Sequence, residues 1–222
     1  MGLNIFDIIG PVMIGPSSSH TAGAVRIGKI AAIILGEPVK RAEIYLHGSF
    51  AETYKGHGTN LALIAGLLGY NTDDQRIKEA MKIAGEKNIE VEFIPTNLGP
   101  NNHPNTAKLV LTGVNGGTNT VTGASVGGGN IVISKIDQFK VDISGDYHAL
   151  IVAHQDRPGS IAKVSALLAE DEVNIAEMKV SREQKGDLAM MIIETDQVVS
   201  QEILEKIRAL PLIESAVMVM PI

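Results

Sequence analysis

The order of hydrophobic periodicities after Tyr147 is the strongest constraint on the fold. ALIVAHQDRPGS has the pattern of an apolar strand followed by a turn, and SIAKVSALLAE has the spacing of a helix. NIAEMKVSRE and DLAMMIIETD alternate as strands, QEILEKIRAL is again helical, and ESAVMVMPI closes the series as a strand. This β-α-β-β-α-β order predicts a ferredoxin-like split unit.

The residues before this unit predict a further mixed α/β (α+β) domain. Apolar residues at helical spacing predict a helix over 21–35, which follows a run of serines and ends at Gly36. The stretch 113–130 is rich in Gly, Asn and Thr and predicts turns, bulges or a short hairpin. Further helices are expected at 59–69 and 74–87, and strands at 40–47, 90–94, 107–112 and 131–136.

The polar stretch VDISGD, residues 141–146, is the expected boundary between the two parts. The predicted domains are therefore 1–143 and 147–222. With 222 residues, 45% of them hydrophobic, the chain is long and apolar enough to fold as one large or two small domains.

Composition argues against several classes of function. The formal net charge is -6 and the Lys and Arg residues are scattered, so a nucleic-acid surface is not expected. The apolar run at the N-terminus is interrupted by Pro11, Gly15 and Pro16 and has no basic residues before it. It therefore predicts neither a signal peptide nor a membrane span, and we expect a cytoplasmic protein.

The chain contains no cysteine. Disulfides, a thiolate nucleophile, a zinc-thiolate site and a cysteine-bound iron-sulfur cluster are therefore excluded for this chain alone. Any such chemistry requires a partner chain.

The segment GPSSSHTAGA, residues 15–24, places a histidine among hydroxyl groups immediately before the predicted helix. The first N–H groups of a helix lack partners and, together with hydroxyl donors, suit a carboxylate or a phosphate. Simple N-capping is the alternative, because one serine or threonine already satisfies such a terminus. The residues concerned are Ser17, Ser18, Ser19, His20 and Thr21.

Three further histidine segments carry candidate chemistry. His57 lies between two glycines in KGHGTN, where its imidazole could be presented to a pocket and could take up a proton, and His47 in HGSF is also expected in a loop. His103 lies among asparagines in NLGPNNHPNT, which suits either a polar substrate or an Asx-rich turn. An exposed turn is the alternative for His57. The spacing of these histidines shows no metal motif, so we expect no metal held by this chain.

Taken together, FDIIGPVMIGPSSSHT, the GS followed by KGHGT, and the later HPN resemble the beta chain of the two-subunit, iron-sulfur-dependent L-serine dehydratases. The segment from about 147, with HQDRPGSIAKVSALL and VNIAEM, resembles an ACT amino-acid-binding module, which such beta chains carry at the C-terminus. The resemblance covers the whole chain. One departure is Asn60 after GHGT, where Asp is common in the family.

This resemblance implies an L-serine ammonia-lyase: L-serine loses water, and the enamine tautomerises and hydrolyses to pyruvate and ammonia. It implies no pyridoxal phosphate. It implies instead a 4Fe-4S cluster held by the cysteines of an alpha chain, which acts as a Lewis acid toward the serine hydroxyl in a hetero-oligomer.

The resemblance implies that this chain binds the substrate and removes its alpha proton. The hydroxyls of Ser17, Ser18, Ser19 and Thr21 would hold the substrate carboxylate. His57 is the expected base for the alpha proton, with His20 the second candidate. His103 and Asn105 would orient the ammonium or hydroxyl group.

In the ACT-like part, relatives bind an amino-acid effector at the strand-to-helix turn that holds Asp156 and Gly159 here, with Asn174 at the start of the next strand. Such sites commonly form between two paired modules. Homodimerisation without ligand sensing is an equal alternative.

A competing hypothesis is a non-catalytic amino-acid sensor, because the N-terminal part also resembles the allosteric substrate-binding (ASB) domain of some phosphoglycerate dehydrogenases. A sensor needs donors for carboxylate and ammonium but no base, so the joint presence of His20, His57 and His103 favours the enzyme subunit. A phosphate-binding protein is less favoured, since the chain has neither a Walker nor a Rossmann glycine motif.

Overall fold

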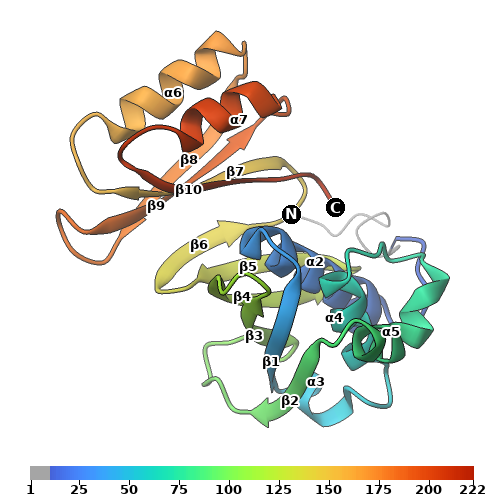
Figure 1. Ribbon diagram of the computed structural model, residues 1–222. Helices are drawn as coiled ribbons and strands as arrows, with labels where there is room; N and C mark the ends of the chain where they lie inside the picture. The colour runs from blue at the N-terminus through green and yellow to red at the C-terminus, as the bar shows by residue number, and fades with distance from the viewer. Residues whose placement is uncertain (1–10) are drawn as a thin grey trace, which may run out of the picture. The chain divides into compact units, whose positions relative to one another are not determined.

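The computed structural model describes residues 11–222 and contains two compact units, which divide between Asp137 and Gln138. Each unit has helices and a sheet, so the predicted mixed α/β class is confirmed (Figure 1). The exact domain limits 1–143 and 147–222 remain a prediction.

The larger sheet has the strand order β2-β1-β3-β4-β5-β6. Strand β1 is parallel to β2 and antiparallel to β3, so the chain between β1 and β2 must cross over the sheet. That crossover carries the GHGT segment. The strands are β1 (Val39–His47), β2 (Glu90–Thr96), β3 (Thr106–Gly113), β4 (Thr118–Gly127), β5 (Asn130–Ile136) and β6 (Phe139–Ile143).

Helices α2, α4 and α5 lie on one side of this sheet (Figure 1). Strand β1 alternates accordingly: Ala42, Ile44 and Leu46 are buried and the residues between them are not. The helical elements of this unit are the π-helical turn η1 (Ser18–Ala22), α2 (Gly23–Leu35), α3 (Ser49–Thr53), α4 (Thr59–Leu67), the 3-10 helix η2 (Gln75–Glu79) and α5 (Ala80–Glu86).

Helix α2 confirms the expected helix and its end at Gly36, which has φ of 74° and donates its N–H to the Ala32 carbonyl at 3.2 Å. It packs against α4 through two glycines. A Cβ at Gly28 would collide with the Leu63 carbonyl oxygen, and one at Gly66 with that of Val25. This contact joins Val25 and Gly28 of α2 to Leu63 and Gly66 of α4. The segments that precede these two helices carry His20 and His57.

The stretch 113–130 forms more regular structure than expected. Strand β4 occupies ten of its residues, with the predicted bulges near Gly123 and Ser125. Gly123 of this stretch serves packing, because a Cβ there would lie 2.7 Å from Ile133 Cδ1 and 3.3 Å from Ile27 of α2. From the side of α2, a Cβ at Gly23 would collide with Ser125 Oγ of β4. Small residues therefore let α2 lie close on the sheet.

Two other elements were not expected. Strand β1 confirms the strand predicted over 40–47 and ends at His47, whereas Ser49, in the predicted loop HGSF, begins the short helix α3. Strand β6 covers Phe139–Ile143, next to and partly within the stretch expected to separate the domains.

After β6, the second unit has the predicted β-α-β-β-α-β order. Its antiparallel sheet has the strand order β10-β7-β9-β8, and α6 and α7 lie on one face of it (Figure 1). The core between helices and sheet includes Leu150, Val164, Met191 and Ile207. The elements are β7 (His148–Gln155), α6 (Ser160–Glu170), β8 (Ile175–Arg182), β9 (Leu188–Thr195), α7 (Gln201–Arg208) and β10 (Ile213–Val219).

The contact between α2 and α4 predicts opposite effects for two helical glycines. Gly66→Ala should lower the free energy of unfolding by about 1–3 kcal/mol, because the added methyl group has no room at the helix contact. Gly85→Ala in α5 should raise it by roughly 0.5 kcal/mol, because nothing lies within 4 Å and alanine favours the helix. Urea unfolding followed by circular dichroism measures both, and equal effects would contradict this packing.

Candidate active site

The π-helical turn η1 places His20 at the entrance to α2. Single π-helical turns often occur at functional sites. Ser17 is the N-cap: its Oγ accepts the backbone N–H of His20 at 3.3 Å, and its carbonyl accepts the N–H of Thr21 at 2.8 Å. The capping alternative for the serine run is therefore confirmed for Ser17.

The imidazole of His20 is held from both sides. Its Nδ1 lies 3.3 Å from Ser17 Oγ, and its Nε2 lies 3.1 Å from Ser49 Oγ. His20 is only 9% exposed, and its ring and that of Phe50 pack in an edge-to-face arrangement with centroids 5.3 Å apart. Sequence reasoning did not select Ser49, although it follows β1 directly in HGSF.

His57 stands against His20. The ring centroids are 4.8 Å apart and the rings are close to perpendicular, at 81°. His57 lies in an exposed turn before α4, as expected, and the following Gly58 has φ of 73°. Two histidines 37 positions apart in the sequence are thus brought into contact by the packing of α2 on α4.

Burial, and then the neighbouring His57, lower the pKa of His20 below its ordinary value. Desolvation disfavours the charged imidazolium, and a second histidine at this distance adds repulsion when both are charged. His20 is therefore neutral at neutral pH. Each of its nitrogens already faces a hydroxyl group, so the ring is restrained rather than free.

A cavity of about 220 Å³ opens beside the two histidine segments. It is small for a ligand pocket, which suits a metabolite of a few heavy atoms. Most of its wall is apolar, and Thr21, His57 and Lys78 are its side chains with polar groups. The lining residues are Ile14, Gly15, Pro16, Thr21, His57, Gly58, Leu61, Ile77 and Lys78.

Polar atoms without partners point to a ligand near this cavity. Thr21 is 2% exposed, and its Oγ1 has no hydrogen-bond partner within residues 11–222. The same holds for Thr59 Oγ1 and for Asn60 Oδ1 at the start of α4. Buried polar groups in native proteins are almost always paired, so the unpaired Oγ1 of Thr21, which lines the cavity, calls for a further partner.

The other predicted substrate residues lie outside this cavity lining. Ser18 and Ser19 are half-buried in η1. The exposed His103 accepts the N–H of Asn105 at its own Nδ1, 3.1 Å away, as in the Asx-rich turn considered from the sequence. Their loop nevertheless approaches the site, since the Phe50 N–H donates to the Pro104 carbonyl at 3.4 Å. His47 Nδ1 accepts the N–H of Leu98 at 3.1 Å.

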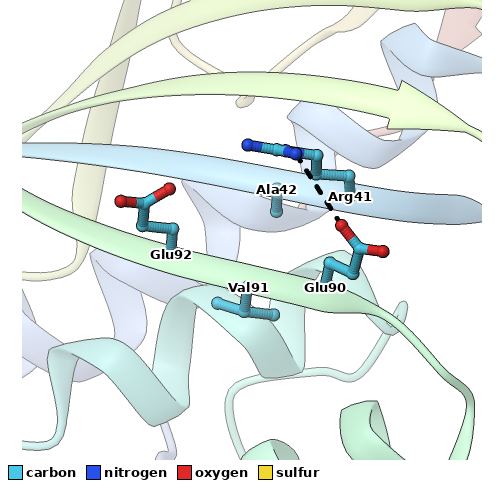
Figure 2. Close-up of a pocket in the computed structure, with 5 residues that line it drawn as sticks. All are labelled: Arg41, Ala42, Glu90, Val91 and Glu92. Atoms are coloured by element: carbon cyan, nitrogen blue, oxygen red, sulfur yellow. Dashed lines mark ion pairs between the residues drawn. The ribbon is translucent and has the colours of Figure 1, made fainter.

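Another hollow, of about 300 Å³, lies on β1 and β2 (Figure 2). Its side chains include Arg41, which pairs with Glu90 at 3.8 Å and with Glu43 at 2.8 Å. Exposed ion pairs of this kind are common on protein surfaces and contribute little. None of the serine or histidine motifs reaches this hollow, so we do not regard it as the functional site.

In the second unit, Asp156 and Asn174 lie at opposite ends of the sheet. Asp156 follows the end of β7, where its carboxylate accepts hydrogen bonds from Arg182 at 2.6 Å and from the Gly186 N–H at 3.0 Å. The Gly186 N–H and the Arg182 guanidinium hold the pKa of this carboxyl below its usual value. Asn174 precedes β8, where its Nδ2 donates to Asp196 at 2.6 Å.

The strand register explains this separation. Gln155 pairs with Leu188 at one end of β7 and β9, and His148 pairs with Thr195 at the other. Gly159, with φ of 93°, is the N-cap of α6 on the Asp156 side. One copy of the unit therefore does not bring all three predicted effector residues together.

Within residues 11–222, no group of three or more His, Asp or Glu side chains is placed to hold a metal ion. No helix in the same range has the length and apolar character needed to cross a membrane.

Comparisons with known proteins bear on both units. The sequence pattern described as serine dehydratase beta chain matches residues 4–136, and that of the ACT domain matches residues 148–212. A probable L-serine dehydratase beta chain of Bacillus subtilis is 48% identical, with 94% of each chain covered. The L-serine dehydratase beta chain of Peptoniphilus asaccharolyticus is 38% identical, with 89% of each chain covered. A D-3-phosphoglycerate dehydrogenase of Synechocystis is 28% identical over 76% of this chain and 30% of its own length.

Proposed function

The chain belongs to the serine dehydratase beta chain family, and from this premise we propose that it is one subunit of a two-chain L-serine ammonia-lyase. The reaction removes water from L-serine to give an enamine, which tautomerises to an imine and hydrolyses to pyruvate and ammonia. The observation that carries the proposal is the contact between His20 and His57 beside a small cavity. This arrangement supplies a proton acceptor next to a site of the right size.

The iron-sulfur cluster of our proposal belongs to the partner chain. Cysteine thiolates are the usual ligands of such clusters, and this chain has no cysteine. The described residues also lack a cluster of other ligands. The residues present therefore do not fit a resident cluster, and this chain's contribution is substrate binding and proton handling.

We assign the role of base to His57 rather than to His20. The ring of His20 is buried, neutral and engaged at both nitrogens. His57 lines the cavity, and no described residue forms a hydrogen bond with its ring. A base needs a free nitrogen within reach of the substrate proton. His57 meets this requirement, and the ring of His20 packs against it and holds it in place.

We assign substrate contacts from the side-chain polar groups that have no hydrogen-bond partner and from the charge on the cavity wall. Thr21 Oγ1 is buried, unpartnered and at the cavity, so it is the first candidate for a substrate contact. Ser17 is a positioning group, since its hydroxyl already serves both the backbone and the ring of His20. Ser18 and Ser19 remain candidates for the carboxylate, and Lys78 is the positively charged residue on the cavity wall. His103 and Asn105 are proposed to act from the adjacent loop.

An amino-acid sensor is the second candidate function, favoured by the likeness to phosphoglycerate dehydrogenases. A sensor has no use for a histidine presented to the cavity and backed by a second histidine. The contact between His20 and His57 therefore favours the enzyme subunit.

For the ACT domain we propose an effector site shared between two copies of the chain. Asp156 and Gly159 lie at one end of the sheet and Asn174 at the other, so a second copy is needed to complete the set. An amino-acid effector would compete with Arg182 for the Asp156 carboxylate through its ammonium group.

Pyruvate formation from L-serine tests the function. The chain and a cysteine-bearing partner with its cluster reconstituted should be active under anaerobic conditions only when mixed. His57→Ala should lower the rate by about a hundredfold or more, since general-base catalysis contributes that much. His148→Ala in β7 of the second unit is the matched control and should keep the wild-type rate. An inactive mixture that still binds L-serine would favour the sensor, and a normal rate for His57→Ala would remove this residue from the mechanism.

Calorimetric titration with L-serine as the probe tests the shared effector site. The wild-type chain should show two classes of L-serine site, the proposed active site and the proposed effector site. Asp156→Ala and Asn174→Ala should each lack the effector site. Mixing these two variants should restore part of the binding, because some mixed dimers keep one intact site. Asp146→Ala, an exposed residue between β6 and β7, is the control. Unchanged binding in both variants, or no recovery on mixing, would contradict a shared site.

A further inference from the structure

Ser49 occupies a place that the assigned roles leave unexplained. It begins α3 immediately after β1, and its Oγ lies 3.1 Å from Nε2 of His20, 29 residues earlier in the chain. The turn before it is sharply defined: Gly48 has φ of 56°, and a Cβ there would lie 2.7 Å from the Pro104 carbonyl oxygen. Only glycine suits this turn, so the position of Ser49 follows from the ends of β1 and β3.

The hydrogen bonds around His20 are compatible with one tautomer in which both hydroxyl groups have a role. Ser17 Oγ accepts the backbone N–H of His20, and its own hydroxyl hydrogen is available to be donated to Nδ1 of the same residue. In the tautomer that uses this donor, Nδ1 of the ring is the acceptor and Nε2 carries the hydrogen. Ser49 Oγ faces that N–H as its acceptor.

We propose that Ser49 is a positioning residue that accepts the Nε2–H of neutral His20 and thereby fixes the ring against which His57 stands. Ser49 and Phe50 are neighbours on α3, and together they restrain the ring, one by a hydrogen bond and the other by edge packing. The part of the proposal that concerns catalysis rests on the proposed function. The part that concerns His20 does not.

Loss of the Ser49 hydroxyl should release the ring. The Nε2–H would be left without its acceptor in a buried place, which is unfavourable unless the ring turns or changes tautomer. Either change alters the surface that faces His57 at 4.8 Å. The structure therefore links a serine outside the cavity lining to the orientation of the proposed base.

Nuclear magnetic resonance of the full chain, labelled with ¹⁵N at histidine, tests the proposal without the partner. In the wild type, His20 should be neutral at pH 7, with hydrogen on Nε2 and a pKa lowered by burial from that of an ordinary histidine. Ser49→Ala should change the Nε2 shift and the tautomer ratio of His20. Ser49→Thr should keep the wild-type signals, because it retains the hydroxyl group.

Two further variants guard against a purely structural effect. Thr53→Ala removes a hydroxyl of α3 that donates only to the Ser49 carbonyl, at 2.7 Å, and should leave the His20 signals unchanged. Ser49→Cys is close in size to serine but offers only a weak acceptor, so it should change the His20 signals as expected for Ser49→Ala. It therefore tests the proposal if the alanine variant does not fold. Unchanged His20 signals in Ser49→Cys or Ser49→Ala would overturn the proposal, as would hydrogen on Nδ1 in the wild type.

Kinetics with the partner chain connect the same variants to function. Ser49→Ala should lower kcat by roughly tenfold, the size expected for one lost hydrogen bond, with little change in KM. Ser49→Thr should restore kcat. If the wild-type mixture makes no pyruvate while His20 responds to Ser49 as described, the proposed function fails and the positioning role stands. Normal kcat in Ser49→Ala, in an active mixture, would refute the catalytic part.

Discussion

Two hydroxyl groups hold the imidazole of His20, and the remaining features of the site are arranged around that ring. Ser17 holds one nitrogen from the turn before α2, and Ser49 holds the other from the start of α3. Helices α2 and α4 pack closely at Gly28 and Gly66, and His57, which precedes α4, stands against the same ring. Because burial lowers its pKa, this ring would support the proposed base His57 without competing with it for a proton.

This arrangement explains how a chain without cysteine can belong to an enzyme family that, on our proposal, uses an iron-sulfur cluster. The chain offers a small, largely apolar cavity, one exposed imidazole and a buried hydroxyl that lacks a partner. On our proposal these groups bind a substrate and accept a proton, and the partner chain supplies the Lewis acid. A site divided between two chains is the simplest arrangement that uses both sets of groups.

Much of the fold and part of the site could be predicted from the sequence. Strong periodicity identified the ferredoxin-like unit, and the glycines around His57 indicated a presented imidazole. Strand β4 was missed because Gly123 within it serves packing against Ile27 of α2, which composition alone does not reveal. Ser49 was missed because its partner lies 29 residues away and meets it only through the turn at Gly48. Long-range contacts of this kind depend on tertiary packing, not on local pattern.

Chemical rescue measures the central claim, that His57 is the base and His20 its support, most directly. His57 is exposed at the cavity, so its removal by His57→Ala leaves room for free imidazole to enter from solvent. In the complete mixture with the cluster-bearing partner, pyruvate formation by His57→Ala should rise with the concentration of unprotonated imidazole. His20→Ala, whose side chain is buried, should not respond. Rescue of His20→Ala alone, or of neither variant, would contradict the account.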